Sequence, residues 1–226
     1  MISEVVCRVL FQAAGLLVLE AAVVHASQNF ADSWNGTDMP IKMEPGDYFG
    51  TVYVDDVIPG PLRDFASVED PGEIVQMWVI DCLICNLDRN LWGNCLLKFG
   101  ARTKKCRLIP ADQSDCFCGS GALADGSWRS RMERQGAVGV GLLPQAVAAL
   151  GGAAGIQAAV EKAENAIRKV GEAFDQVPNA WWDAASIKPE EVEESLWNRA
   201  RALPNLLNIE MWGTFNYGEY EGIPIL

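Results

Sequence analysis

The sequence predicts an α+β fold that is mostly helical, with one short β-hairpin and a rudimentary strand region near the N-terminus. Three observations support this fold class. Apolar residues recur every three or four positions over residues 3–14 and again over 156–174, which is the spacing of a buried helix face. Two short apolar runs, at 95–99 and 106–109, are joined by a turn that contains Gly and Lys, as in a β-hairpin. The Val- and Leu-rich residues 16–26 are typical of a buried strand.

The remaining elements are predicted from the turn and capping residues between the apolar runs. Gly15 ends the first helix, and residues 32–46 have the Gly, Asn, Asp and Pro content of a loop. A helix at 73–86 places Asp81 on an apolar face, where a carboxylate is unusual. The predicted elements, in chain order, are helix 3–14, strand 16–26, strand 48–54, helix 73–86, hairpin 95–109, helix 156–174 and a last helix from Pro189 to Pro204.

Composition and charge bound the class of protein. The 226 residues are 50% hydrophobic, which is enough to bury one substantial core. The formal net charge of −12 argues against a general nucleic-acid binder, because a phosphate backbone requires a basic surface. We therefore expect no direct nucleic-acid partner, although a nucleotide held through metal ions is compatible with this charge.

The cysteines and the N-terminal apolar stretch predict a cytoplasmic protein. The seven Cys residues are an odd number without the spacing of a disulfide framework, which favours a reducing compartment. Arg8 and Glu20 interrupt the apolar stretch 5–26, and such charges are costly in a signal peptide or a membrane span. We therefore expect no membrane association.

Two patterns suggest chemistry but favour a structural interpretation. Cysteines at a spacing compatible with zinc lie among apolar residues, where buried thiols commonly serve as hydrophobic filler. These are Cys82, Cys85, Cys116 and Cys118. His25 is the single histidine and lies in a predicted apolar strand, so a His-dependent catalytic triad is not expected.

The polar residues that carry a candidate chemistry gather around the hairpin. They are Asp81, Asn86, Asp88, Arg89, Asn90 and Asn94, followed beyond the hairpin by Asp112. Because a hairpin returns the chain to its starting point, Asp112 is expected close to the loop that holds Asp88 and Asn94. Carboxylate and amide oxygens suit Mg²⁺, and phosphoryl transfer needs such metal ligands together with a carboxylate near the attacking oxygen. The alternatives are a local ion pair between Asp88 and Arg89, and a turn role for Asp112.

These residues also carry a resemblance to a known family. The segments Asp81-Cys-Leu-Ile-Cys-Asn86-Leu-Asp88-Arg89, Gly93-Asn94-Cys-Leu-Leu97 and Leu108-Ile-Pro-Ala-Asp112 resemble the catalytic and metal-binding segments of HipA-like kinases. The wider phosphatidylinositol kinase group shares a similar pattern. The resemblance implies a kinase-like C-lobe with the active site on the hairpin.

The resemblance also implies a role for each residue of the site. Asp88 would be the catalytic aspartate that orients the acceptor hydroxyl, and Arg89 would belong to the catalytic loop and support it. Asn86, Asn94 and Asp112 would form the cofactor site, in which Asn94 and Asp112 hold the metal. Asp81 and Asn86 would also fix the loop through hydrogen bonds.

The resemblance extends over much of the chain, which we interpret as a single HipA-like kinase domain spanning 1–226. Residues 1–60 would be the remnant of a lobe-spanning helix, strands and hinge, and residues 61–226 the helical catalytic lobe. The sequence departs from the family pattern in three ways. Asn90 stands where His is frequent, Asn94 follows Asp88 by six residues rather than five, and no Gly-rich loop or strand lysine precedes Glu4, the expected partner of that lysine.

The resemblance therefore implies an ATP- and magnesium-dependent phosphotransferase that acts on a Ser or Thr hydroxyl of a protein substrate. ATP and magnesium are the expected cofactors. The alternative is a catalytically inactive nucleotide-binding or interaction module, a pseudokinase, because most of the N-lobe is missing from the pattern.

Overall fold

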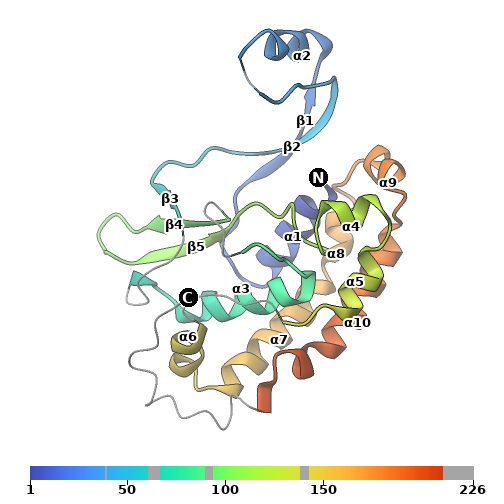
Figure 1. The fold of residues 1–226 in the computed structure, drawn as a ribbon. Helices are drawn as coiled ribbons and strands as arrows, with labels where there is room; N and C mark the ends of the chain where they lie inside the picture. The colour runs from blue at the N-terminus through green and yellow to red at the C-terminus, as the bar shows by residue number, and fades with distance from the viewer. Residues whose placement is uncertain (39, 61–66, 90–93, 138–142, 211–226) are drawn as a thin grey trace.

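The computed structural model describes residues 1–38, 40–60, 67–89, 94–137 and 143–210 and has the predicted α+β architecture (Figure 1). Helices form the body, and the strands form two small antiparallel sheets. The helices are α1 (Ile2–Ala13), α2 (Gln28–Asn35), α3 (Pro71–Ile84), α4 (Ser120–Ala124), α5 (Trp128–Arg134), α6 (Leu143–Ala149), α7 (Ala153–Ile167), α8 (Val170–Phe174), α9 (Asn179–Ala185) and α10 (Pro189–Leu206). The strands are β1 (Ala21–Ala26), β2 (Gly46–Thr51), β3 (Val57–Pro59), β4 (Cys95–Phe99) and β5 (Cys106–Pro110).

Helix α3 lies at the centre of the body. Its side chains are buried on all sides, because α1, α6, α7, α10 and the strand β5 pack around it. The Asp70 side chain caps the helix by accepting the N–H of Gly72 at 2.8 Å, and Pro71 occupies the first turn. The helix ends at Cys85, whose backbone is left-handed with φ of 50°. The packing of α3 therefore fixes where the following polar loop begins, at Asn86.

The sheet β3-β4-β5 contains the predicted hairpin. Strands β4 and β5 pair antiparallel, with Leu97 opposite Leu108, within one residue of the predicted bounds. Buried Glu73 joins this hairpin to α3, since its Oε2 accepts the N–H of Leu108 at 2.8 Å and its Oε1 pairs with Arg107. This contact ties β5 to the first turn of α3, at the end of the helix opposite the polar loop.

Strands β1 and β2 differ from the sequence prediction. They form a two-stranded arm that projects from the body with α2 at its far end (Figure 1). Strand β1 begins at Ala21 rather than at residue 16 and is largely exposed, because its sheet has one partner strand and no covering layer in the described part of the chain. His25 is exposed on this strand, and its Nδ1 lies 2.8 Å from Asp47. Helix α2 occupies part of the predicted loop and is capped by Ser27, which accepts the N–H of Phe30.

The C-terminal helices confirm the predicted buried face but not its continuity. The apolar positions from Ile156 to Val170 are buried as predicted, yet the stripe is divided between α7 and α8, with Gly171, a poor helix former, near the break. Helix α10 continues past Pro204 to Leu206, because a proline in the last turn removes few helical hydrogen bonds.

Helices α6 and α7 meet at a sharp bend. Among the described residues no single helix is long and apolar enough to cross a membrane, whereas α6 and α7 reach that length and composition together, with 98° between them. Both helices pack against α3, and their inward faces belong to the core.

Candidate functional site

The loop after α3 is fixed by a buried arginine. Arg89 is 5% exposed, and its guanidinium donates two hydrogen bonds to Asp81, from Nε to Oδ2 at 2.9 Å and from Nη2 to Oδ1 at 3.0 Å. Burial raises the pKa of Asp81, while Arg89 and the Asn86 amide act in the opposite direction. Burial also opposes the charge of Arg89, but the Asp81 carboxylate outweighs it and raises the arginine pKa. The pair accounts for a carboxylate on an otherwise apolar helix face.

Arg89 also holds both sides of the hairpin's open end. Its Nη1 donates to the carbonyl oxygen of Asn94, just before β4, and at 2.9 Å to that of Ala111, just after β5. Its Nη2 donates to Gln113 Oε1 at 2.8 Å, and its guanidinium lies over the Phe11 ring of α1, 5.4 Å from the centroid. Arg89 therefore acts in this structure as a positioning residue for the loop, and its ion-pair partner is Asp81 rather than the neighbouring Asp88.

Asp88 and Asn94, which the sequence analysis placed in the same loop, are in direct contact. Asn94 is buried, and its Nδ2 donates to Asp88 Oδ2 at 2.7 Å and to the Asp88 carbonyl oxygen at 3.0 Å. Asn86 bridges the loop to the helix: its Nδ2 donates to Asp81 at 3.0 Å, and its Oδ1 accepts the N–H of Asp88 at 3.2 Å. Asn94 thus holds the Asp88 carboxylate, and Asn86 holds the Asp88 backbone.

The second oxygen of Asp88 has no hydrogen-bond partner within the described part of the chain. Oδ1 is buried and accepts no hydrogen bond from the described residues. The pKa of Asp88 is raised, first by burial and then by the negative charges of Asp115 and Asp112, while the Asn94 hydrogen bond and Arg89 lower it. A buried acceptor without a partner is costly, so this oxygen is suited to a donor that comes from outside the described chain.

Asp112 lies beyond the hairpin's open end in a left-handed turn. Its φ is 49°, a conformation that Asp tolerates better than most residues. Its Oδ1 accepts the N–H of Ser114 at 3.2 Å and the Ser114 hydroxyl at 2.6 Å, and the residue is exposed. Asp112 therefore has the turn role that the sequence analysis gave as an alternative. In this turn the Asp112 carboxylate is close enough to Asp88 for its charge to raise the Asp88 pKa.

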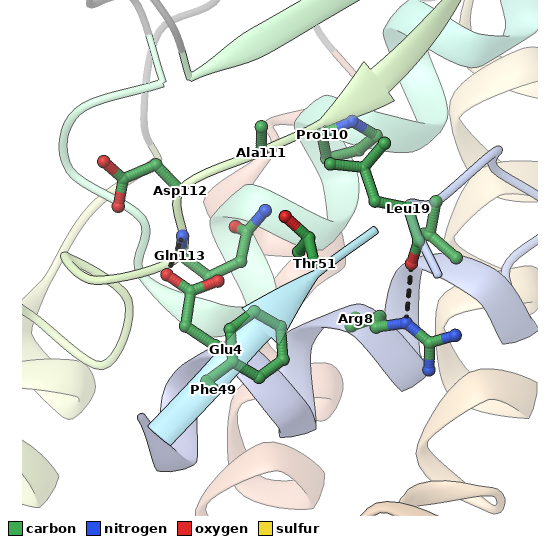
Figure 2. A pocket seen from close by; sticks show the side chains of 10 residues that line it. Glu4, Arg8, Leu19, Phe49, Thr51, Pro110, Ala111, Asp112 and Gln113 are labelled. Carbon is green, nitrogen blue, oxygen red and sulfur yellow. Dashed lines mark hydrogen bonds between the residues drawn. The ribbon is translucent and has the colours of Figure 1, made fainter. Parts of the chain in front are cut away.

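A cavity of about 230 Å³ lies beside this turn, between α1, β2 and the segment after β5 (Figure 2). Glu4 accepts the N–H of Gln113 at 2.9 Å at one end, and Arg8 donates from Nε to the Leu19 carbonyl at 2.8 Å at the other. Burial raises the pKa of Glu4, and the Gln113 N–H opposes this effect. Figure 2 shows the Asp112 carboxylate pointing away from Arg8 at the cavity's edge.

Several residues of this region were not assigned from the sequence. Asp115 contributes to the electrostatics of Asp88, Gln113 bonds both Arg89 and Glu4, and Arg8 lines the cavity. Gln113 and Asp115 follow Asp112 directly, so the polar character of residues 112–115 is a signal that could have indicated them. Arg8 shares a face with Glu4 one helical turn away, and the same spacing could have pointed to it.

The described residues do not form a closed cage of protein ligands for a metal ion. Within the described residues no group of three or more His, Cys, Asp or Glu side chains is arranged to hold a metal ion. Mg²⁺ is usually held by one or two carboxylates together with substrate phosphates and water. Asn94 and Asp112, the expected magnesium ligands, would supply one amide oxygen and one carboxylate to such a site.

Comparisons with known proteins add no relative to this description. No protein-family model, no curated protein and no solved structure matches the chain. The resemblance to HipA-like kinases therefore rests on the sequence of this chain alone.

Proposed function

We propose that this chain is a HipA-like phosphotransferase that binds ATP with magnesium and transfers phosphate to a Ser or Thr hydroxyl of a protein. One observation carries the proposal: the contact between Asp88 and Asn94 at the open end of a hairpin whose far side continues into Asp112. The resemblance assigns these three residues to catalysis and metal binding.

Asp88 is the residue proposed to orient the acceptor hydroxyl. Its Oδ2 is held by Asn94, which leaves Oδ1 as the acceptor for an incoming O–H. The raised pKa makes this carboxylate a better proton acceptor than an ordinary aspartate. Arg89 bonds the carbonyl oxygens of Asn94 and Ala111 and so holds the two ends of the hairpin at a fixed spacing.

The nucleotide is proposed to lie along the cavity beside Asp112. At about 230 Å³ it is smaller than the roughly 300–1,000 Å³ of complete ligand pockets, so it accommodates one part of ATP. Its charged lining residues are Glu4, Arg8 and Asp112. Two carboxylates repel phosphates unless a cation accompanies them, which is consistent with entry of ATP as its magnesium complex.

Magnesium, when bound, would neutralise charge that develops across the transferring phosphate. Asn94 and Asp112 are the residues proposed to hold it. Arg8 is proposed to bind the phosphates as a second cation. Its Nε donates to the Leu19 carbonyl oxygen, and its terminal nitrogens make no hydrogen bond with the described residues.

The non-catalytic nucleotide-binding module is the second candidate. It is favoured by the Ser114 bonds that occupy Asp112 Oδ1, because these bonds compete with metal binding.

Calorimetric titration with ATP, with and without magnesium, tests the proposal. A phosphotransferase should bind ATP in a magnesium-dependent manner and should pass labelled γ-phosphate to a protein acceptor. Binding without transfer would favour the inactive module. Failure to bind ATP in either condition would overturn both candidates and leave a structural helical protein.

A further inference from the structure

Cys85 and Cys118 lie together where the end of α3 meets the segment that follows β5. The N–H of Cys118 donates to the Cys85 carbonyl oxygen at 3.3 Å, and the preceding Phe117 N–H donates to Ile84 at 2.7 Å. With standard bond lengths, the first of these hydrogen bonds keeps the two Cα atoms within about 7 Å of each other. Disulfides usually span about 4.4–6.8 Å between Cα atoms, so the backbone spacing is compatible with a disulfide.

The two side chains also interact. The thiols of Cys85 and Cys118 are close enough for each to shift the pKa of the other. The Met132 carbonyl oxygen, 4.0 Å from the Cys85 sulfur, is the competing acceptor, but Arg199 already donates to it at 2.7 Å. Cys85 is fully buried, whereas Cys118 retains 7% of its surface, which gives a small reagent a route to the pair through Cys118.

We propose that Cys85 and Cys118 are a redox-active dithiol, which a hydroperoxide oxidises to a reversible disulfide. The Cys118 thiolate attacks one peroxide oxygen and breaks the O–O bond, which gives a sulfenic acid and releases water or an alcohol. The Cys85 sulfur then displaces the sulfenic hydroxyl, which leaves as water with the Cys85 proton. Two thiols thereby lose two electrons and two protons, and the peroxide gains them.

The electrostatics of the pair assign the two roles. The hydrogen bond from Cys85 lowers the pKa of Cys118 to about 7 against the opposing effect of burial, and the charges of Arg199 and Arg131 lower it further. The same interaction, together with burial, raises the pKa of Cys85. Cys118 is therefore the attacking thiolate, and Cys85 is the thiol that resolves the sulfenic acid.

A second cysteine pair provides an internal control. Cys7 of α1 also interacts with Cys116, but both residues are fully buried. Burial, followed by the Cys7 interactions, raises the pKa of Cys116 well above its ordinary value. This pair is expected to behave as inert core packing.

The proposed disulfide would act on the segment that carries the candidate site, although the inference does not depend on the proposed function. Cys85 directly precedes Asn86, and Cys118 lies six residues after Asp112. A covalent bond between them would tie the start of the polar loop to the end of the 112–118 segment. Disulfides in reducing compartments are usually transient and regulatory. A bond next to the candidate site is suited to such a regulatory role.

The test is peptide mapping of the full chain after mild hydrogen peroxide treatment. Remaining thiols are alkylated, the protein is digested without reduction, and the peptides are identified by mass spectrometry. We expect a peptide that joins Cys85 to Cys118, lighter by two hydrogen atoms than its reduced parts and lost on treatment with dithiothreitol. Absence of this peptide, or an equal yield of a peptide joining Cys7 to Cys116, would overturn the proposal.

Three variants separate the roles. Cys85→Ser should leave Cys118 as a sulfenic acid that dimedone traps, and Cys118→Ser should slow peroxide oxidation of Cys85 by roughly tenfold or more, because only the thiolate reacts. Cys7→Ser is the matched control and should leave the yield of the Cys85–Cys118 disulfide unchanged. If Cys118→Ser does not fold, the wild-type map and the dimedone result for Cys85→Ser still decide the question. Dimedone labelling of a cysteine other than Cys118 would contradict the assignment.

Discussion

Arg89 and Asp81 form a bidentate ion pair whose side chains are 2% and 0% exposed, at the point where α3 passes into the polar loop. The same guanidinium bonds the carbonyl oxygens on both sides of the hairpin's open end. Buried charges of this kind are tolerated when all their hydrogen-bonding groups are satisfied. The pair therefore determines where Asp88, Asn94 and Asp112 can lie relative to one another.

Arg89→Met should reduce the free energy of unfolding by about 3–5 kcal/mol, because it leaves the Asp81 carboxylate buried without its partner. Urea denaturation followed by circular dichroism measures the change. Arg129→Met is the control, since Arg129 pairs with Glu191 and Glu194 on the surface and should cost no more than about 1 kcal/mol. Equal losses in the two variants would contradict the structural role of Arg89.

The helical core and the hairpin could be predicted because their signals are local. Alternation and turn residues define β4 and β5, and the apolar run of α3 can only be buried. The arm could not be predicted in the same way, because the burial of β1 depends on whether other strands or helices cover it, and residues 21–26 alone do not encode that. Helix α2 depends on one capping serine within a segment of loop composition.

The candidate site was predictable in part for the same reason. The hairpin spacing brings Asn94 and Asp112 to one end, and the short loop brings Asp88 to Asn94. The bond between Glu4 and Gln113 depends on how α1 packs against the segment after β5. Such a contact joins residues more than a hundred positions apart, and no local pattern indicates it.

Glu4→Gln should alter the pH dependence of stability. Burial raises the pKa of Glu4 in the folded state above its ordinary value of 4.5, so the charged form opposes folding as pH rises through the folded pKa. Below the ordinary value the carboxyl is protonated in both states and this cost is absent. The variant should therefore gain stability relative to wild type at neutral pH, and the difference should vanish in acid.

Chemical denaturation over a pH series measures this difference. Glu161→Gln is a suitable control, because it makes the same change at an exposed position of α7. A Glu4→Gln variant that is less stable than wild type by the same amount at every pH would show that the cost of burying Glu4 is not electrostatic.

Arg8→Met should weaken binding of ATP by roughly tenfold or more, since a hydrogen bond to a charged group contributes about 1.5–3 kcal/mol. Binding of adenosine, which has no phosphates, should change little. Calorimetry with both ligands measures the effect, and Arg168→Met, at an exposed position after α7, is the matched loss of charge. An equal loss for ATP and adenosine would indicate damage to the cavity rather than loss of a phosphate contact.

The most direct test of the central claim is transfer of labelled γ-phosphate from magnesium ATP by the wild type, Asp88→Asn and Asp112→Asn, measured beside ATP affinity. The wild type should transfer phosphate, and Asp88→Asn should bind ATP normally but transfer at least roughly a hundredfold more slowly, the scale of losing a positioned proton acceptor. Asp112→Asn should instead weaken magnesium-dependent binding, and its turn should survive because Asn also tolerates the left-handed backbone. Full transfer rates in both variants, or no transfer by the wild type, would contradict the account.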